Sequence, residues 1–296
     1  MQILYGPGLG ALSALGSALT WALIGLLVRT LSPVFNSVTI NAVRTSVGSV
    51  LLLVWLFLTG ATGELLEVSP KALGLLAVST ALAFGLGDTV FFESTRSLGL
   101  ARAMTVSMTY PLIAALLAWA LIGEPITASV AAGSLLTLSG LALIVTARKE
   151  ETLREARFWL GLATATLASI AWAVSVILMK PPLREVDATI AQAIRLPLAG
   201  ALLWATPWTR GAAGQLKRSG NRAIWRMAWL GALTTASSVM FVAGLKYAGV
   251  AVATVLSSTA PMFAIPLGLF FLGERLAPRA VLGSLVTVAG IALLQL

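Results

Sequence analysis

Long uncharged, apolar stretches alternate with short polar connections along most of the chain. A helix at the surface of a soluble protein needs a strongly polar face, and these stretches lack one. At about 20 residues for each crossing of a bilayer, the pattern predicts an all-α polytopic membrane protein with ten transmembrane helices. We place these spans at residues 8–28, 38–58, 72–96, 101–122, 128–147, 158–179, 187–208, 225–247, 251–272 and 278–296.

The composition agrees with this class of protein. Of 296 residues, 58% are hydrophobic and 10% are charged, whereas about a quarter of the residues in an ordinary soluble domain are charged. The net charge of +9 comes mainly from Lys and Arg in the connections, so we expect the lipid bilayer, and no nucleic acid, as a partner. The chain has no Cys and no His, which removes the usual transition-metal ligands and the commonest general base. We therefore expect no cofactor, no bound metal and no enzymatic activity.

The two halves of the chain repeat each other. Residues 99–142 match residues 249–292 at 16 of 44 positions without a gap, and an offset of 151 aligns the earlier part. Five spans in each repeat are an odd number, so the second repeat must enter the membrane with the opposite orientation. The sequence thus predicts two inverted five-helix repeats, residues 1–147 and 158–296, joined by a charged linker at 148–157. Inverted repeats are common in secondary transporters, whose substrate site lies near the membrane midplane between the halves.

Particular residues recur at equivalent places in the two repeats. Each has a Trp in its first span, an Arg in its second and a Pro in the middle of its fourth, and Gly-Glu closes that fourth span as Gly123-Glu124 and Gly273-Glu274. In these features the chain resembles the EamA type of the drug/metabolite transporter superfamily. The resemblance implies a ten-helix basket whose central cavity is lined by spans 1, 3, 4, 6, 8 and 9, with spans 5 and 10 at the periphery. It also implies transport, often export, of amino acids, other small metabolites or drugs.

Lys and Arg are unevenly distributed between the two sides of the predicted membrane. The connections that follow the odd-numbered spans carry most of them, whereas the opposite side carries Lys71, Lys180, Arg184 and Lys246. The positive-inside rule then places both termini outside. We expect the protein in the inner (plasma) membrane of a prokaryote, with the monomer as its functional unit.

Three charged residues lie well inside the predicted spans, away from the span ends. Asp88 is in span 3, and its repeat equivalent is Ser238, so the repeat symmetry does not require a charge there. A carboxylate inside the membrane is a candidate proton carrier or a partner for an amine. The other interpretation is a fixed ion pair with an Arg such as Arg44 or Arg96. Arg44 and Arg195 are repeat equivalents in spans 2 and 7, where they either contact the substrate or a gate, or stabilise helix packing and extend towards the interfaces.

Two prolines predict matched polar positions near the midplane. Pro111 and Pro261 lie at the centres of spans 4 and 9, and each frees the carbonyl four residues earlier, at Ser107 and Ser257. A kink that serves packing alone is the other interpretation.

Aromatic residues supply candidate cavity walls. Trp21 and Trp172 are repeat equivalents inside spans 1 and 6, away from the interfaces where Trp is commonest. They line the cavity or pack against lipid and neighbouring helices. Tyr110, whose equivalent is Ala260, could add an aromatic ring with a hydroxyl to the wall.

Small residues predict a close helix contact at the periphery. Gly133 and Gly140 in span 5, and their equivalents Gly283 and Gly290 in span 10, stand seven residues apart and so share one helix face. Small residues let membrane helices approach closely. We expect spans 5 and 10 to form a seam between the repeats.

The sequence as a whole favours a secondary transporter that exports small molecules. Protons are a candidate coupling ion. Nucleotide-sugar exchange is the main alternative. It would require several basic residues in the cavity to bind phosphate, whereas only Arg44 and Arg195 lie deep within the spans. A non-transporting membrane scaffold is a further alternative, but it would leave the inverted repeats and the centred prolines without an explanation.

Overall fold

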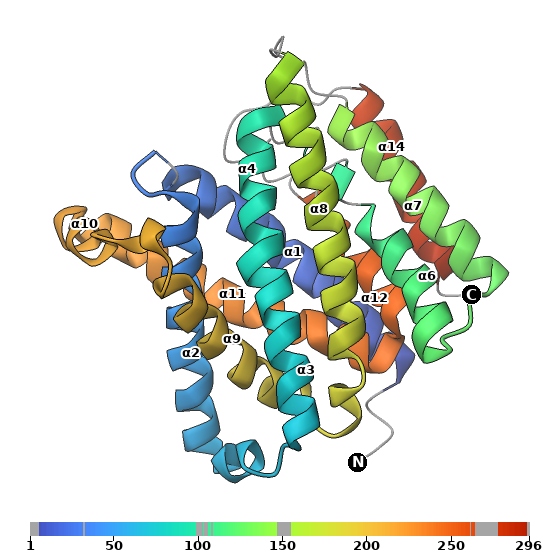
Figure 1. Ribbon diagram of the computed structural model, residues 1–296. Helices are drawn as coiled ribbons and strands as arrows, with labels where there is room; N and C mark the ends of the chain where they lie inside the picture. Colours follow the sequence, from blue (N-terminus) through green and yellow to red (C-terminus); the bar gives the residue numbers. More distant parts are fainter. Residues whose placement is uncertain are drawn as a thin grey trace.

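The computed structural model describes residues 6–31, 33–98, 103, 106–107, 109–146, 155–260, 262–263 and 278–294. Every regular element within these ranges is helical, so the predicted all-α class is confirmed (Figure 1).

The described residues of the first half of the chain form six α-helices. They are α1 (Pro7–Leu31), α2 (Ser37–Thr59), α3 (Pro70–Thr80), α4 (Asp88–Leu98), α6 (Tyr110–Ile122) and α7 (Ala128–Thr146). The 3-10 helix η2 (Ala61–Leu65) lies between α2 and α3, and the π-helical segment η3 (Ala81–Gly87) joins α3 directly to α4. The predicted third span is therefore a single rod, α3–η3–α4, with a π-helical turn inside it.

Local sequence signals set several helix ends in this half. The side chain of Asn36 accepts a hydrogen bond from the backbone N–H of Thr39 at 2.7 Å and so caps the start of α2. Ser69 caps α3 in the same way, with Pro70 at the first helical position. Helix α6 ends at Gly123, whose φ of 69° is a conformation that favours glycine.

The second half begins with the long helix α8 (Glu155–Met179). The described elements that follow it are, in chain order, η4 (Pro182–Arg184), α9 (Ala188–Trp204), η5 (Pro207–Thr209), α10 (Ala212–Arg218), α11 (Gly220–Ala248), α12 (Val250–Ser257) and α14 (Pro278–Leu294). Helix α11 corresponds to the rod α3–η3–α4 but runs as one continuous α-helix.

Five segments of the described residues are long and apolar enough to cross a bilayer: Pro7–Val28, Ser37–Thr59, Pro70–Phe91, Phe158–Arg184 and Gly220–Ala248. Helix α9 together with Pro207–Arg218 is a sixth candidate, bent by 80°. Three further apolar helices are shorter, Tyr110–Ile122, Ala128–Leu143 and Val281–Leu293. The spans 101–122 and 251–272 include residues outside the described ranges, so the count of ten stays a prediction.

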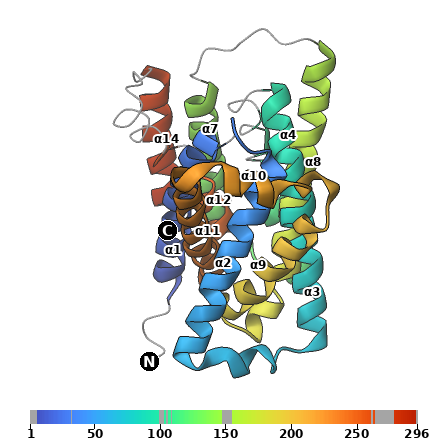
Figure 2. The ribbon, with the colours of Figure 1, turned by 90° about the vertical axis from the view of Figure 1, so that its left-hand side faces the viewer.

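The main packing contacts join the two halves. Helix α1 packs against α11, and α8 packs in the equivalent way against the rod α3–η3–α4. Helix α2 packs against α9, and α7 lies beside α14 (Figures 1 and 2). The halves are therefore interleaved, and the space between them is bordered by both.

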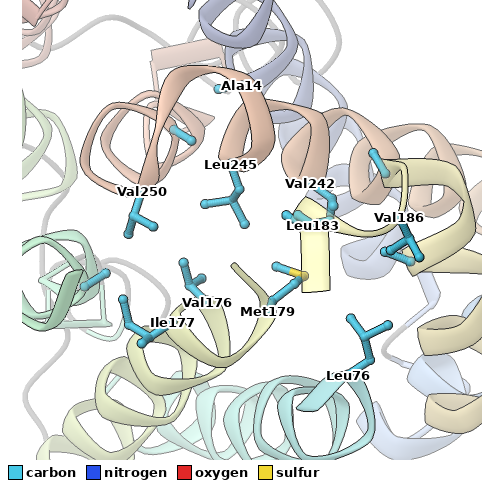
Figure 3. Packing of buried hydrophobic residues seen from close by; sticks show 14 of the residues in the cluster. Ala14, Leu76, Val176, Ile177, Met179, Leu183, Val186, Val242, Leu245 and Val250 are labelled. Atoms are coloured by element: carbon cyan, nitrogen blue, oxygen red, sulfur yellow. The ribbon is translucent and has the colours of Figure 1, made fainter. Parts of the chain in front are cut away.

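A large apolar cluster fills one end of this space. Figure 3 shows Leu245 of α11 and Val250 of α12 facing Val176, Ile177 and Met179 of α8. Leu245 and Val250 are completely buried. This packing connects α8, α11 and α12 on the side where α8 ends.

An ion pair lies near the same end. The Glu124 carboxylate, just after α6, binds the Lys180 ammonium with an Oε1–Nζ distance of 2.9 Å. Its other oxygen accepts a hydrogen bond from the backbone N–H of Val250 at 2.7 Å, at the start of α12. Glu124 thus links the ends of α6 and α8 to the first turn of α12. Its repeat equivalent, Glu274, lies outside the described residues.

The glycine seam between α7 and α14 is confirmed. A Cβ atom added to Gly140 would lie 2.5 Å from the backbone nitrogen of Thr287 and 2.6 Å from the backbone oxygen of Gly283. A Cβ added to Gly290 would lie 2.5 Å from the backbone nitrogen of Thr137. The backbones of the two helices therefore touch, as small residues allow.

Candidate functional site

A cavity of about 160 Å³ lies between the two halves. Its wall contains side chains from helices of both repeats. Its exposed surface is mainly apolar, and hydroxyl groups come from Ser17, Ser175, Thr234, Ser237, Ser238, Ser257 and Ser258. The resemblance implied that the second span of each repeat stays away from the cavity. Instead, Arg44 of α2 and Gln192 and Arg195 of α9 line it, because α2 and α9 pack against each other across the interface between the halves.

Arg44 and Asp88 form a buried ion pair at the cavity wall. Their Nη2 and Oδ2 atoms are 2.7 Å apart, and the two residues are 1% and 6% exposed. The Nε–H of Arg44 donates to Oδ1 of Asn41 at 2.7 Å. The indole N–H of Trp172 donates to the other oxygen of Asp88 at 3.0 Å. The ion pair with Arg44 that the sequence allowed for Asp88 is therefore present, and a role of Asp88 as a proton carrier stays a prediction.

The π-helical segment η3 ends where Asp88 begins α4. A π-turn takes one more residue than an α-turn and is frequent at functional sites. Gly87 contributes as well, since a Cβ at this position would lie 2.6 Å from Cδ1 and Nε1 of Trp172. The missing side chain lets the indole reach the carboxylate of Asp88.

Arg195 is the equivalent of Arg44 but has fewer partners. It is 3% exposed and lines the cavity. Its Nη2 makes a long contact of 3.4 Å with the Ser175 hydroxyl, and its Cζ lies 5.5 Å from the ring centre of Phe84. Among the described residues its Nε atom has no hydrogen-bond partner, and none of their ion pairs includes it.

Gln192 lies one helical turn before Arg195 on α9. Its side-chain nitrogen donates to the backbone oxygen of Ser238 at 3.1 Å. This contact identifies Oε1 as the remaining acceptor, and Oε1 is buried without a partner among the described residues.

Aromatic rings form part of the wall, as predicted for Trp21, Trp172 and Tyr110. The guanidinium carbon of Arg44 lies 5.3 Å from the ring centre of Trp21, close enough for a cation–π contact. The rings of Tyr110 and Trp172 meet edge to face with centres 5.9 Å apart, and the Tyr110 hydroxyl donates to the backbone oxygen of Thr254 at 3.3 Å. Their part in transport stays a prediction.

The two prolines and the serines four residues before them differ in whether they line the cavity. Ser257 lines the cavity. Ser107 and Pro111 are buried but do not line it, and Pro261 lies outside the described residues. Of the two matched serines, Ser257 alone is a wall residue of the described cavity, and their position near the membrane midplane stays a prediction.

Several wall residues were not singled out from the sequence. The hydroxyls of Ser17 on α1 and Ser237 on α11 are 3.2 Å apart and connect the two repeats within the wall. Single serines in apolar spans are common and gave no distinct signal. Gln192 could have been found, because an amide stands three residues before the Arg in both repeats, as Asn41 and as Gln192. Among the described residues, no cluster of three or more Asp, Glu, His or Cys could hold a metal ion.

Comparison with known proteins decides the family. The model of the EamA-like transporter family matches the chain twice, over residues 8–146 and 159–296. The chain belongs to the EamA-like transporter family. The two matches also give the two-repeat layout of this family, and with the apolar helices they identify an integral membrane protein and a transporter.

Relatives agree with this assignment. An uncharacterized transporter of Archaeoglobus fulgidus is 26% identical over 286 residues, which cover 96% of this EamA chain and 97% of the relative. The uncharacterized transporter YvbV of Bacillus subtilis is 30% identical over 143 residues, about half of each chain. A solved crystal structure, 17% identical in sequence, superposes with a TM-score of 0.79 over 97% of this chain and 98% of its own. That last likeness concerns the fold alone.

Proposed function

We propose that this EamA-family protein is a secondary transporter that exports small metabolites through the central cavity by alternating access. In this proposal ten spans form two inverted five-helix repeats, and the repeats exchange conformations around a fixed site. Both termini lie outside the inner membrane of a prokaryote. Export and the candidate substrates, amino acids and other small metabolites, follow the family resemblance.

The observation that carries the proposal is the set of charges at the cavity. Ionisable groups inside a membrane are costly and mark substrate or ion pathways by default. Arg44, Asp88 and Arg195 all line one cavity, which both halves of the chain enclose. Packing between helices alone would not require three charges around the same empty space.

Asp88 is the candidate for coupling to protons. Protonation would remove its charge and weaken its bond to Arg44, and the indole of Trp172, from the other repeat, binds the same carboxylate. A change of protonation at Asp88 therefore acts on a contact between the two halves. This is the kind of contact that must change in alternating access.

Nucleotide-sugar exchange receives less support. A pyrophosphate group needs several cations, and the Asp88 carboxylate already neutralises Arg44. Arg195 alone is left among the charged wall residues that the structure describes.

The test is uptake into proteoliposomes that contain the purified protein. Radiolabelled amino acids, amines, small carboxylates and lipophilic cations are offered with and without a proton gradient. We expect one class to accumulate above the level of protein-free liposomes. Folded protein that moves none of these classes, in either direction, would refute the transport proposal.

A further inference from the structure

The two repeats carry equivalent residues at or beside the cavity, but those of the second repeat have fewer hydrogen-bond and charge partners among the described residues. Asn41 and Arg44 correspond to Gln192 and Arg195, each pair at an offset of 151. Asn41 and Asp88 give Arg44 an acceptor and a counter-charge at 2.7 Å each. In the second repeat the position of Asp88 is taken by Ser238.

The consequence is visible in the atoms left without partners. The Nε of Arg195 and the Oε1 of Gln192 are both buried without a hydrogen bond among the described residues. An unpaired buried polar atom is costly, and an unpaired buried charge is more so. The second repeat thus lacks a negatively charged group where the first has the carboxylate of Asp88.

We propose that Arg195 binds the carboxylate of a compact organic anion, which supplies to the second repeat the counter-charge that Asp88 supplies to the first. The inference rests on the proposed transport function and names its substrate class. A planar guanidinium matches a carboxylate in geometry, and such charge-assisted bonds are the strong ones.

The charge of the cavity selects an anion over a zwitterion. The described wall residues carry two guanidinium groups and one carboxylate, so a ligand of charge −1 neutralises them. The ammonium group of an amino acid would bring a further positive charge to this wall, whose one described carboxylate is already paired with Arg44.

The size of the cavity and the free acceptor of Gln192 narrow the class of ligand further. A cavity of about 160 Å³ is close in volume to an engineered protein cavity of about 150 Å³ that binds benzene, so it has room for a ligand of a few heavy atoms. The free Oε1 of Gln192 calls for a donor on the ligand, and Phe84, Val176 and Phe241 offer apolar wall. A small 2-hydroxy carboxylate meets each of these conditions.

The experiment compares ligands of equal size and different charge. The thermal unfolding temperature of the detergent-purified protein is measured with L-lactate, lactamide and L-alanine, and with 2-hydroxy-3-methylbutanoate, its amide and L-valine. A ligand that binds the folded state raises this temperature. We expect one or both hydroxy acids to raise it and their amides and amino-acid analogues to have little effect. Equal or larger shifts with the amides or amino acids, or no shift with either hydroxy acid, would overturn the proposal.

Ser238→Asp tests the symmetry argument directly. The new carboxylate supplies the missing counter-charge, so we expect a higher unfolding temperature without ligand and a hydroxy-acid Kd raised roughly tenfold or more. Ser129→Asp, the same change at the start of α7 and away from the cavity, should leave the Kd unchanged. Arg195→Gln should also lose the response, and Arg195→Lys should keep part of it. If the Ser238→Asp and Arg195→Gln variants bind the hydroxy acid as tightly as the wild-type protein does, Arg195 is not its binding residue.

A failure of the Arg195 proposal can be distinguished from a failure of the transport proposal. Carboxylate binding in detergent without flux in proteoliposomes would refute transport and leave the Arg195 site standing. Flux of an amine or neutral solute without carboxylate binding would refute the Arg195 site and leave transport standing.

Discussion

The indole of Trp172 donates a hydrogen bond to the carboxylate of Asp88 across the boundary between the two repeats, at 3.0 Å. Asp88 is held on its other side by Arg44 of its own repeat. The carboxylate is therefore shared between the halves, and a movement of α8 relative to α4 must change its set of donors.

Replacing Trp172 by Phe keeps an aromatic ring at this position but removes the indole N–H donor. One oxygen of a buried carboxylate would lose its partner, and we expect a loss of about 1–3 kcal/mol in the free energy of unfolding. Chemical or thermal unfolding in detergent measures this change. Trp159→Phe, at an exposed position of α8, is the matched control and should change stability less. Equal effects of the two substitutions would argue against the Asp88 contact.

The Arg44–Asp88 pair predicts a strong non-additive effect. Removing one partner of a buried pair costs about 3–5 kcal/mol because the other charge stays buried alone. Arg44→Gln and Asp88→Asn should each destabilise the protein, and the double variant should be more stable than the sum of the single effects predicts. A double-mutant cycle from unfolding measurements gives the coupling free energy. Additive single effects would mean that the pair is not coupled.

Asp88→Asn also tests the proposed coupling to protons. A side chain that cannot ionise should abolish the stimulation of flux by a pH gradient in proteoliposomes. Exchange of labelled for unlabelled substrate without a gradient serves as the control, since it reports whether the variant still moves substrate. Unchanged stimulation by the gradient would remove Asp88 from the coupling mechanism.

The seam between α7 and α14 predicts a steric effect at Gly140. A methyl group there would meet the backbone of Thr287 and Gly283, which cannot move aside as a flexible side chain can. We expect Gly140→Ala to lower the free energy of unfolding by about 1–3 kcal/mol. Gly74→Ala in α3, with no atom within 4 Å of the added Cβ, should be neutral or slightly stabilising. A neutral Gly140→Ala would show that the helices are farther apart.

The distribution of Lys and Arg predicts the orientation in the membrane. With both termini outside, green fluorescent protein fused to the C-terminus should stay dark in a bacterial host, and alkaline phosphatase fused there should be active. A fluorescent fusion would reverse the predicted orientation of every span.

The length of the uncharged, apolar stretches predicted the helices. Residue types that are rare within membrane spans indicated which side chains line the cavity. The cavity is lined by five such residues: Trp21, Arg44, Asp88, Trp172 and Arg195. Charged groups and indole N–H donors within a membrane need polar partners, which the cavity wall supplies. The partner of Asp88 could not be chosen from the sequence, since the choice between Arg44 and Arg96 depends on how helices rotate and pack.

The contribution of α2 and α9 to the cavity wall could likewise not be predicted from the sequence. It depends on the contact between these helices across the repeats, and nothing in the order of spans specifies that contact. The π-helical turn Ala81–Gly87 leaves no mark in the apolar sequence ALAFGLG, because the same residues suit an α-helix.

That π-helical turn makes the ion pair depend on chain length as well as on residue type. Each residue of an α-helix advances the side-chain direction by about 100°. Deleting one residue between Ala81 and Gly87 would turn Asp88 away from Arg44, and an insertion would turn it the other way. A homologue can therefore keep both charges and still lose their contact, so related chains should be compared by the spacing of this segment as well as by its residues.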